Sequence, residues 1–115
     1  MATLRSKELE ESYGKYLKDN PVSVHCPLCS KASIKEFKYW RIVKNSFPYD
    51  VIASVHDMIL PIRHSTENDL SNEEIEELLH IKYNYIGENY QYLMESAHGE
   101  KSIPEHFHLH LLVIK

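Results

Sequence analysis

The sequence predicts an α+β fold, an antiparallel sheet with one long helix packed on a face and a short helix at the N-terminus. Three observations predict this fold class: short segments rich in aromatic and β-branched residues, one long segment of helical periodicity, and a final segment of period two. A chain of 115 residues is too small to divide, so we predict a single domain over 1–115. Residues 1–23 would form the N-terminal helix and linker, and 24–115 the core.

The first element is predicted to be a short amphipathic helix over 7–19, because its apolar side chains recur on one helical face. The step from Asn20 to Pro21 is expected to end this helix, since a proline restricts the residue before it. The side chains of the apolar face are Leu9, Tyr13, Tyr16 and Leu17.

Two strands are predicted next. Residues 35–44, KEFKYWRIVK, and the segment IASVHDMILPIRH that begins at Ile52 are rich in aromatic and β-branched residues. The residues between them, NSFPYD at 45–50, are typical of a turn. The sequence therefore predicts two strands joined by this turn.

A long helix is predicted to begin at Ser71. Ser71 as N-cap and Glu74 three residues later form the pattern of a capping box. Apolar residues then recur at helical spacing as far as His98 and Gly99, which indicates one buried face. The residues of this face are Ile75, Leu78, Leu79, Ile86, Tyr90, Leu93, Met94 and Ala97.

Composition excludes some classes of partner. The 13 Lys and Arg residues against 17 Asp and Glu residues leave no basic block for a phosphate backbone, so no nucleic-acid polymer is expected as a partner. No apolar run is long enough for a membrane span, and the N-terminus does not resemble a signal peptide. We therefore expect a soluble, cytoplasmic protein that does not bind a membrane.

The closing segment, Glu105 to Ile114, carries the most informative pattern. A strand there would place His106, His108 and His110 on one face, with apolar residues on the other. Three imidazoles in register indicate a site more than a solvated face, because histidine has a near-neutral pKa and is both a nucleophile and a metal ligand. The spacing fits a metal site and a nucleophilic imidazole that attacks phosphorus equally well.

The chain has only two cysteines, Cys26 and Cys29, in a Cys-x-x-Cys pair. This spacing is that of half a tetrahedral zinc site, whose other ligands would come from elsewhere in the chain. Two thiols without a metal and a thioredoxin-like redox pair are the alternatives.

The segment at 106–112, HFHLHLL, matches at every position the motif His-φ-His-φ-His-φ-φ, where φ is apolar, and so resembles the histidine triad (HIT) family. The upstream segments NSFPYD and HDMILPIRH are similar to the family's aromatic-Pro-Tyr turn and Pro-x-x-His element. The similarity runs from about Val24 to Ile114. It implies a HIT-like fold for the predicted sheet and helices.

The resemblance implies roles for particular residues. His108 would be the nucleophile that attacks the α-phosphate of a nucleotide conjugate, and His110 would hold that phosphate or its leaving group. Asn45 would bind the ribose, with a turn-forming role as the alternative, and His56 would lie near the phosphate. Ser102 would assist the leaving group, although it precedes the triad by four residues and the phosphoramidase branch has a serine three residues ahead.

The resemblance also implies a structural zinc site. In some similar branches, two cysteines join the His of the Pro-x-x-His element and the first His of the triad. Here these residues are Cys26, Cys29, His64 and His106. A closed site of four ligands would bind Zn²⁺ without activating water.

These expectations define the predicted function: a HIT-like nucleotide hydrolase or nucleotidyl transferase that forms a nucleotidyl-histidine intermediate. Its partner would be a nucleotide or nucleotide conjugate, and the protein would be a homodimer, as relatives commonly are. One alternative is a zinc-dependent hydrolase in which all three triad histidines bind one open metal. The other is a nucleotide-binding relative without enzymatic activity.

Overall fold

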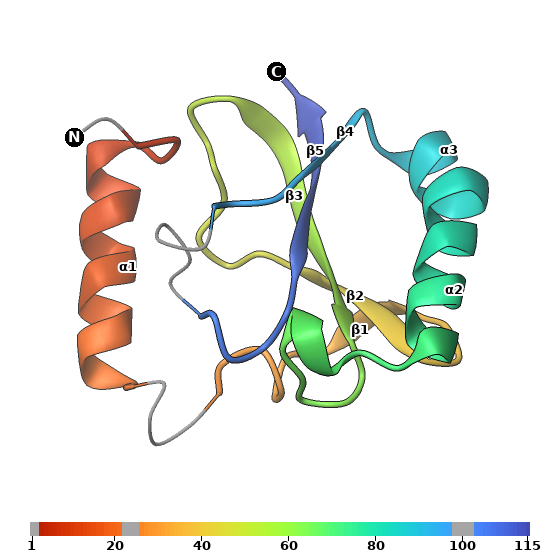
Figure 1. Ribbon diagram of the computed structural model, residues 1–115. Coiled ribbons are helices and arrows are strands. Elements are labelled where there is room, and N and C mark those ends of the chain that lie inside the picture. The colour runs from red at the N-terminus through yellow and green to blue at the C-terminus, as the bar shows by residue number, and fades with distance from the viewer. Residues whose placement is uncertain (1–2, 22–25, 98–102) are drawn as a thin grey trace.

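The computed structural model describes residues 3–21, 26–97 and 103–115 of the chain. Five strands form one sheet in the order β1-β2-β3-β5-β4, and every neighbouring pair is antiparallel. Figure 1 shows this sheet at the centre of the molecule. The strands are β1 (Ser33–Glu36), β2 (Trp40–Lys44), β3 (Ala53–Pro61), β4 (Tyr92–Met94) and β5 (Leu109–Ile114).

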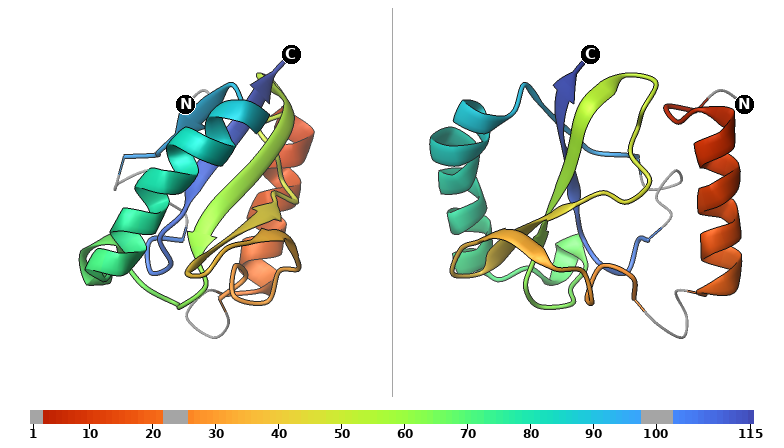
Figure 2. Two further views of the ribbon diagram at one scale, coloured as in Figure 1. Left: turned by 90° about the vertical axis from the view of Figure 1, so that its right-hand side faces the viewer. Right: turned by 180° about the vertical axis from the view of Figure 1, so that it is seen from behind.

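Helices lie on opposite sides of this sheet, as Figures 1 and 2 show. Helix α1 (Lys7–Asp19) has the bounds that the sequence predicts, and Ser6 caps it by accepting a hydrogen bond from the backbone N–H of Leu9. The other side carries one continuous helical segment, made of α2 (Asn72–Ile81), the π-helical turn η2 (Lys82–Ile86) and α3 (Gly87–Asn89). A short 3₁₀ helix, η1 (Glu67–Asp69), precedes α2. The predicted fold class is confirmed.

The long helix begins as predicted and ends earlier than predicted. The capping box is present, with Ser71 and Glu74 each bonded to the other's backbone N–H. The last helical residue is Asn89, because Tyr90 adopts an extended backbone and Tyr92–Met94 pairs with β5 as an edge strand. The apolar residues at 90–94 fit a helix by spacing alone. The segment Tyr92–Met94 forms a strand because it can make backbone hydrogen bonds along the outer edge of β5.

The buried face of the helix also differs from the predicted one. Leu78, Ile81 and Ile86 are buried, whereas Ile75 and Leu79 are 45% and 49% exposed. The π-helical turn adds a residue to one turn of the helix. The buried Ile86 therefore follows the buried Ile81 by five positions, instead of the three or four positions of a regular α-helix.

Two predicted strands have different bounds in the structure. The predicted strand 35–44 is a hairpin, in which β1 and β2 are joined by a turn closed by the hydrogen bond from Phe37 N to Trp40 O (2.7 Å). The predicted strand 105–114 starts its pairing only at Leu109, so His106 and His108 lie in the loop that approaches β5. Period-two patterns do not reveal where a strand partner begins.

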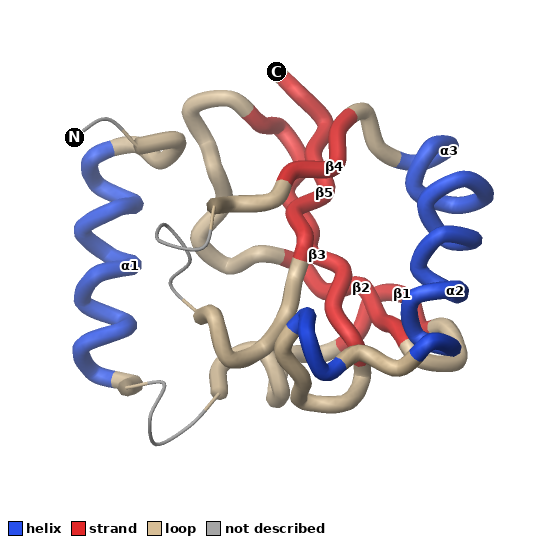
Figure 3. Tube along the Cα trace, in the orientation of Figure 1, coloured by secondary structure: helices blue, strands red, loops and turns tan. Residues whose placement is uncertain are grey.

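Two clusters of buried apolar residues cover the two faces of the sheet. The three triad histidines are buried as well, so they do not lie on a solvated face. The larger cluster lies under α2 and includes Trp40, whose Nε1–H donates to the Glu74 carbonyl oxygen. The smaller lies on the α1 side and comprises Leu28, Val43, Met58, Leu60 and Ile103. Loop segments occupy the space between α1 and the sheet (Figure 3). No helix in the described part of the chain is long and apolar enough to cross a membrane.

Tyr90 provides a test of how the end of the helical segment is held. Its hydroxyl donates to a carboxylate oxygen of buried Asp57 (2.6 Å), and burial together with this bond raises the pKa of Tyr90. Tyr90→Phe should lower the free energy of unfolding by about 1–3 kcal/mol, because Asp57 would lose a donor in a buried place. Urea unfolding measures this change. Tyr92→Phe is the matched control, since Tyr92 is 60% exposed and should differ little from wild type.

Candidate active site and metal centre

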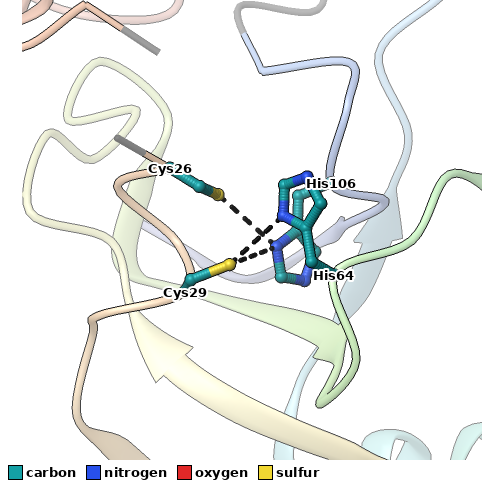
Figure 4. Close-up of side chains that lie close together, drawn as sticks. All are labelled: Cys26, Cys29, His64 and His106. Atoms are coloured by element: carbon teal, nitrogen blue, oxygen red, sulfur yellow. Dashed lines mark hydrogen bonds between the residues drawn. The ribbon is translucent and has the colours of Figure 1, made fainter. Parts of the chain in front are cut away.

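The four predicted metal ligands converge in the structure. The ligand atoms of Cys26, Cys29, His64 and His106 all lie within 4.8 Å of one another. Figure 4 shows the two thiols facing the two imidazoles. The cysteines come from the loop before β1, and His64 and His106 from the loops that follow β3 and precede β5. Segments distant in sequence therefore form one candidate metal centre.

The distances fit a four-coordinate metal. Sulfur-to-nitrogen distances are 3.5 Å for Cys26 to His106, 3.2 Å for Cys29 to His64 and 3.4 Å for Cys29 to His106. A tetrahedral ion with usual metal–sulfur and metal–nitrogen bonds holds neighbouring S and N atoms about 3.6 Å apart. The side chains therefore need to move only slightly to surround an ion.

Hydrogen bonds outside the ligand set hold two of the ligands in place. The ring of His106 is fully buried, and its Nε2–H donates to the Pro61 carbonyl oxygen (3.0 Å), which directs Nδ1 toward the thiols. Buried Arg41 on β2 donates to the carbonyl oxygens of Leu28 and Cys29. The sheet thus orients the cysteine loop before any ion binds.

The surroundings of the thiols distinguish the two interpretations of the Cys-x-x-Cys pair. Desolvation, followed by the hydrogen bond and charge of Cys26, raises the pKa of Cys29 to about 11, and the positive charge of Arg41 opposes this shift only in part. Both thiols face the imidazoles of His64 and His106, which a redox pair does not require. This convergence favours the metal interpretation over the thioredoxin-like one, and a bound cation would deprotonate the thiols.

A cavity of about 650 Å³ lies beside this centre and is lined by residues of α1 and of the sheet. His108 and His110 line it, and so does Asn45. Aromatic side chains of α1 and of the 45–50 turn form another part of its wall, with the rings of Tyr13 and Tyr16 tilted against that of Phe47 at centroid distances of 4.9 and 5.1 Å. The cavity therefore combines imidazoles with an aromatic surface that could contact a planar base.

The tautomer of His108 follows from one hydrogen bond. Its Nδ1 lies 3.0 Å from the backbone carbonyl oxygen of His106, which can only accept, so Nδ1 carries the proton. In the neutral ring the lone pair is then on Nε2, the arrangement that a nucleophilic imidazole requires. The carbonyl belongs to a candidate metal ligand, so the metal centre and the orientation of His108 are linked through the backbone.

A second set of bonds fixes the protons of His56 and His110. The backbone N–H of Tyr49 donates to His56 Nδ1 (2.9 Å), so the proton of His56 is on Nε2. That Nε2–H donates to His110 Nδ1 (2.8 Å), which leaves the proton of His110 on Nε2, 3.4 Å from the Tyr49 hydroxyl. His110 is thereby set as a neutral N–H donor.

The surroundings keep both rings neutral. Burial lowers the pKa of His56 to about 4, with smaller electrostatic contributions from Arg5 and from the neighbouring His108. Burial likewise lowers the pKa of His110 to about 3, with His108, His56 and Arg5 adding to the effect. At neutral pH neither ring is a cation, so His110 would act on a phosphate oxygen through its N–H and not through a charge.

These pKa shifts make stability depend on pH. The unfolded chain, with the ordinary histidine pKa of 6.5, binds more protons than the folded chain, so the free energy of unfolding decreases as the pH falls from 6.5 toward 4. His56→Gln removes one titration, and we expect the slope between about pH 5 and pH 6.5 to decrease by up to about 1 kcal/mol per pH unit. Urea unfolding at several pH values measures the slopes. Equal slopes in the two proteins would contradict the lowered pKa.

Asn45 takes the turn-forming role that the sequence left as an alternative. Its Oδ1 accepts from the backbone N–H of Phe47 (2.8 Å), and its Nδ2 lies 3.3 Å from His56 Nε2. It is buried and still lines the cavity, so ribose binding remains compatible with this geometry. Ser102 lies outside the described residues.

The three histidines of the triad have different partners. His106 joins the cysteines and His64, His108 bonds to a backbone carbonyl, and His110 bonds to His56. Among the described residues, one group of His, Cys, Asp or Glu side chains converges as metal ligands, and it includes only the first triad histidine. This arrangement disfavours the alternative in which all three histidines bind one metal.

Two residues of this site, Tyr49 and Arg5, have no role that a sequence motif assigns to them. Tyr49 sets the His56 tautomer through its backbone, and its ring lies 5.0 Å from that of His110. Arg5 reaches the site from the N-terminal segment. The aromatic-Pro-Tyr turn pointed to the first, whereas no local pattern marks an arginine that acts from before the first helix.

The fold matches solved structures of histidine triad proteins. A structure described as a HIT-like protein has a TM-score of 0.53 and 16% identity, over 71% of this chain and 84% of that one. A HIT family hydrolase from Legionella pneumophila Philadelphia 1 has a TM-score of 0.52 and 22% identity, over 77% and 92%. A HIT family hydrolase from Clostridium thermocellum has a TM-score of 0.53 and 19% identity, over 76% of this chain and 89% of that one. No family model and no curated protein matches the sequence. The chain therefore has the HIT fold.

Proposed function

We propose that the chain is a HIT-like nucleotide hydrolase or nucleotidyl transferase with His108 as nucleophile. The observation that carries the proposal is the His106 carbonyl, which holds the proton of His108 on Nδ1 and so leaves the lone pair of the neutral ring on Nε2. The ring lines a cavity large enough for a nucleotide, together with a second imidazole held as a neutral donor. The fold shared with HIT family hydrolases supports the same function.

The chemistry would proceed in two steps. His108 Nε2 attacks the α-phosphorus of the conjugate, a P–N bond forms, and the bond from phosphorus to the leaving group breaks. The leaving group departs with that electron pair and takes a proton from solvent. Water, or another acceptor in a transferase, then attacks phosphorus and loses a proton to solvent, and the P–N bond breaks with its electron pair returning to His108 Nε2. The Nε2–H of His110 would stabilise the charge that develops on a phosphate oxygen.

The metal centre would have a structural role in this enzyme. Two thiolates and two imidazoles are the ligand set of structural zinc sites, so we assign Zn²⁺ to Cys26, Cys29, His64 and His106. With all four positions filled by protein, the ion would join the cysteine loop to the loop that carries His108. The proposal also includes a homodimer, a cytoplasmic location and a single domain over 1–115.

Intact mass measurement tests this function. The protein is mixed briefly with adenosine 5′-phosphoramidate or with a diadenosine polyphosphate. The reaction is then quenched and the intact mass of the protein is measured. We expect a transient increase by the mass of one adenylyl group, together with release of product. Absence of both adduct and turnover with these substrates would overturn the proposed enzyme. Tight binding of a nucleoside monophosphate in that case would support the non-enzymatic alternative.

A further inference from the structure

Two cations line the cavity, and the proposed chemistry uses neither of them. Arg5 comes from the segment before α1, and Lys31 follows the cysteine loop. Among the described residues, the lining contains a single carboxylate, that of Glu10, although the chain as a whole has a net charge of −4. The cavity is thus a locally positive surface on an acidic protein, which favours an anionic ligand.

The position of Arg5 is determined by several contacts. Its side chain is only 13% exposed, and its Nε donates to the Phe47 carbonyl oxygen (2.7 Å). The guanidinium lies 4.3 Å from the centre of the Tyr13 ring and 4.9 Å from that of Tyr49. Its ion pair with Glu10 is long, at 3.5 Å. These contacts hold one edge of the guanidinium and leave N–H donors for an anion at the cavity wall.

Lys31 is held in a similar way. Its Nζ donates to the hydroxyl of Ser46, and its backbone carbonyl oxygen accepts from the guanidinium of Arg41. Within the described ranges, no carboxylate forms an ion pair with Lys31. A negatively charged ligand in the cavity would be a stronger partner for the ammonium than the Ser46 hydroxyl is, because a hydrogen bond between two charged groups is stronger than one to a neutral group.

The two cations are anchored on adjacent residues of one turn. Arg5 bonds to Phe47, and Lys31 bonds to Ser46. The residue before them is Asn45, which faces His56. Tyr49, under the guanidinium, is in ring contact with His110 at 5.0 Å. Both cations therefore line the same cavity as His108 and His110.

We infer that Arg5 and Lys31 form a second anion-binding site, which selects conjugates that carry a further anionic group beyond the phosphorus attacked by His108. The inference deepens the proposed function and rests on it. The ligand class would be a nucleoside phosphate with at least one additional phosphate or carboxylate, in preference to a conjugate with an uncharged leaving group. The residues would determine specificity and would take no part in bond breaking.

A comparison of two substrates tests this assignment. For wild type, Lys31→Met and Arg5→Met, kcat/KM is measured with diadenosine tetraphosphate and with adenosine 5′-phosphoramidate. We expect each substitution to lower the ratio of the first value to the second by about 10- to 100-fold, since each removes a charge-assisted bond that only the first substrate forms. Lys31→Arg should restore most of the ratio. Lys18→Met removes an exposed charge on α1 and should leave the ratio unchanged.

A purely structural role for the two cations predicts a different result. If Arg5 and Lys31 only hold α1 and the turn, both kcat/KM values fall together and the ratio stays constant, which would overturn the inference. Lys31→Met protects this test against a folding defect in Arg5→Met, because Arg5 contacts Tyr13 and Glu10 of α1, whereas the Lys31 side chain bonds to Ser46 in the turn.

A binding measurement separates this inference from the proposed function. If wild type turns over neither substrate, the proposed function fails, and the affinities for adenosine triphosphate and adenosine monophosphate are compared by calorimetry. The second anion site predicts tighter binding of the triphosphate, and a loss of this preference in Lys31→Met. Equal affinities in wild type would overturn it.

Discussion

His108→Ala should abolish the nucleotidyl adduct and lower turnover by about 10⁴-fold or more, because the substitution removes the nucleophile itself. The fold should persist, since the His108 ring bonds to a backbone carbonyl and is not part of the ligand group or of the two buried apolar clusters. Single-turnover kinetics and intact mass measure the loss.

The matched control is His80→Ala. His80 is an exposed histidine on α2 whose side chain bonds to Asn84 one turn along the helix, and its replacement should leave turnover within about twofold of wild type. An adduct of undiminished yield in His108→Ala would assign the nucleophile elsewhere. His110→Ala should show a smaller loss, because it removes one N–H donor from the phosphate and leaves the attacking nitrogen in place.

The second large effect is expected from the metal centre. Cys26→Ala should abolish stoichiometric zinc binding and lower the midpoint of thermal unfolding by about 10 °C or more, because folding free energy would be lost with the ion. Elemental analysis and thermal unfolding with and without a chelator measure both effects. Turnover should fall as well, since the ligand His106 supplies the carbonyl oxygen that orients His108.

The comparison with His108→Ala makes the result specific. That variant should retain its zinc, because His108 is not among the converging ligands. Zinc that is lost from His108→Ala and retained by Cys26→Ala would instead support an open metal bound by the triad. A thermal midpoint that a chelator does not change would contradict a structural ion.

Local patterns were sufficient for the parts of the fold that depend on neighbouring residues. The bounds of α1 and the capping box at Ser71 and Glu74 are confirmed, because a cap is formed by residues three positions apart. The predicted end of the long helix was wrong, since the apolar residues of Tyr92–Met94 have helical spacing but this segment pairs with β5. Strand pairing depends on a partner that is distant in sequence, and periodicity carries no information about it.

The same division applies to the site. Residue identity and spacing were enough to identify the candidate metal ligands and the triad, because they specify which side chains can bind a metal or attack phosphorus. The folded structure was needed to show that the three histidines have three different partners, and that Tyr49 and His56 set the proton of His110. It also brought Arg5 and Lys31 to the cavity. Tautomers and cavity charge depend on contacts across the fold, which no local pattern encodes.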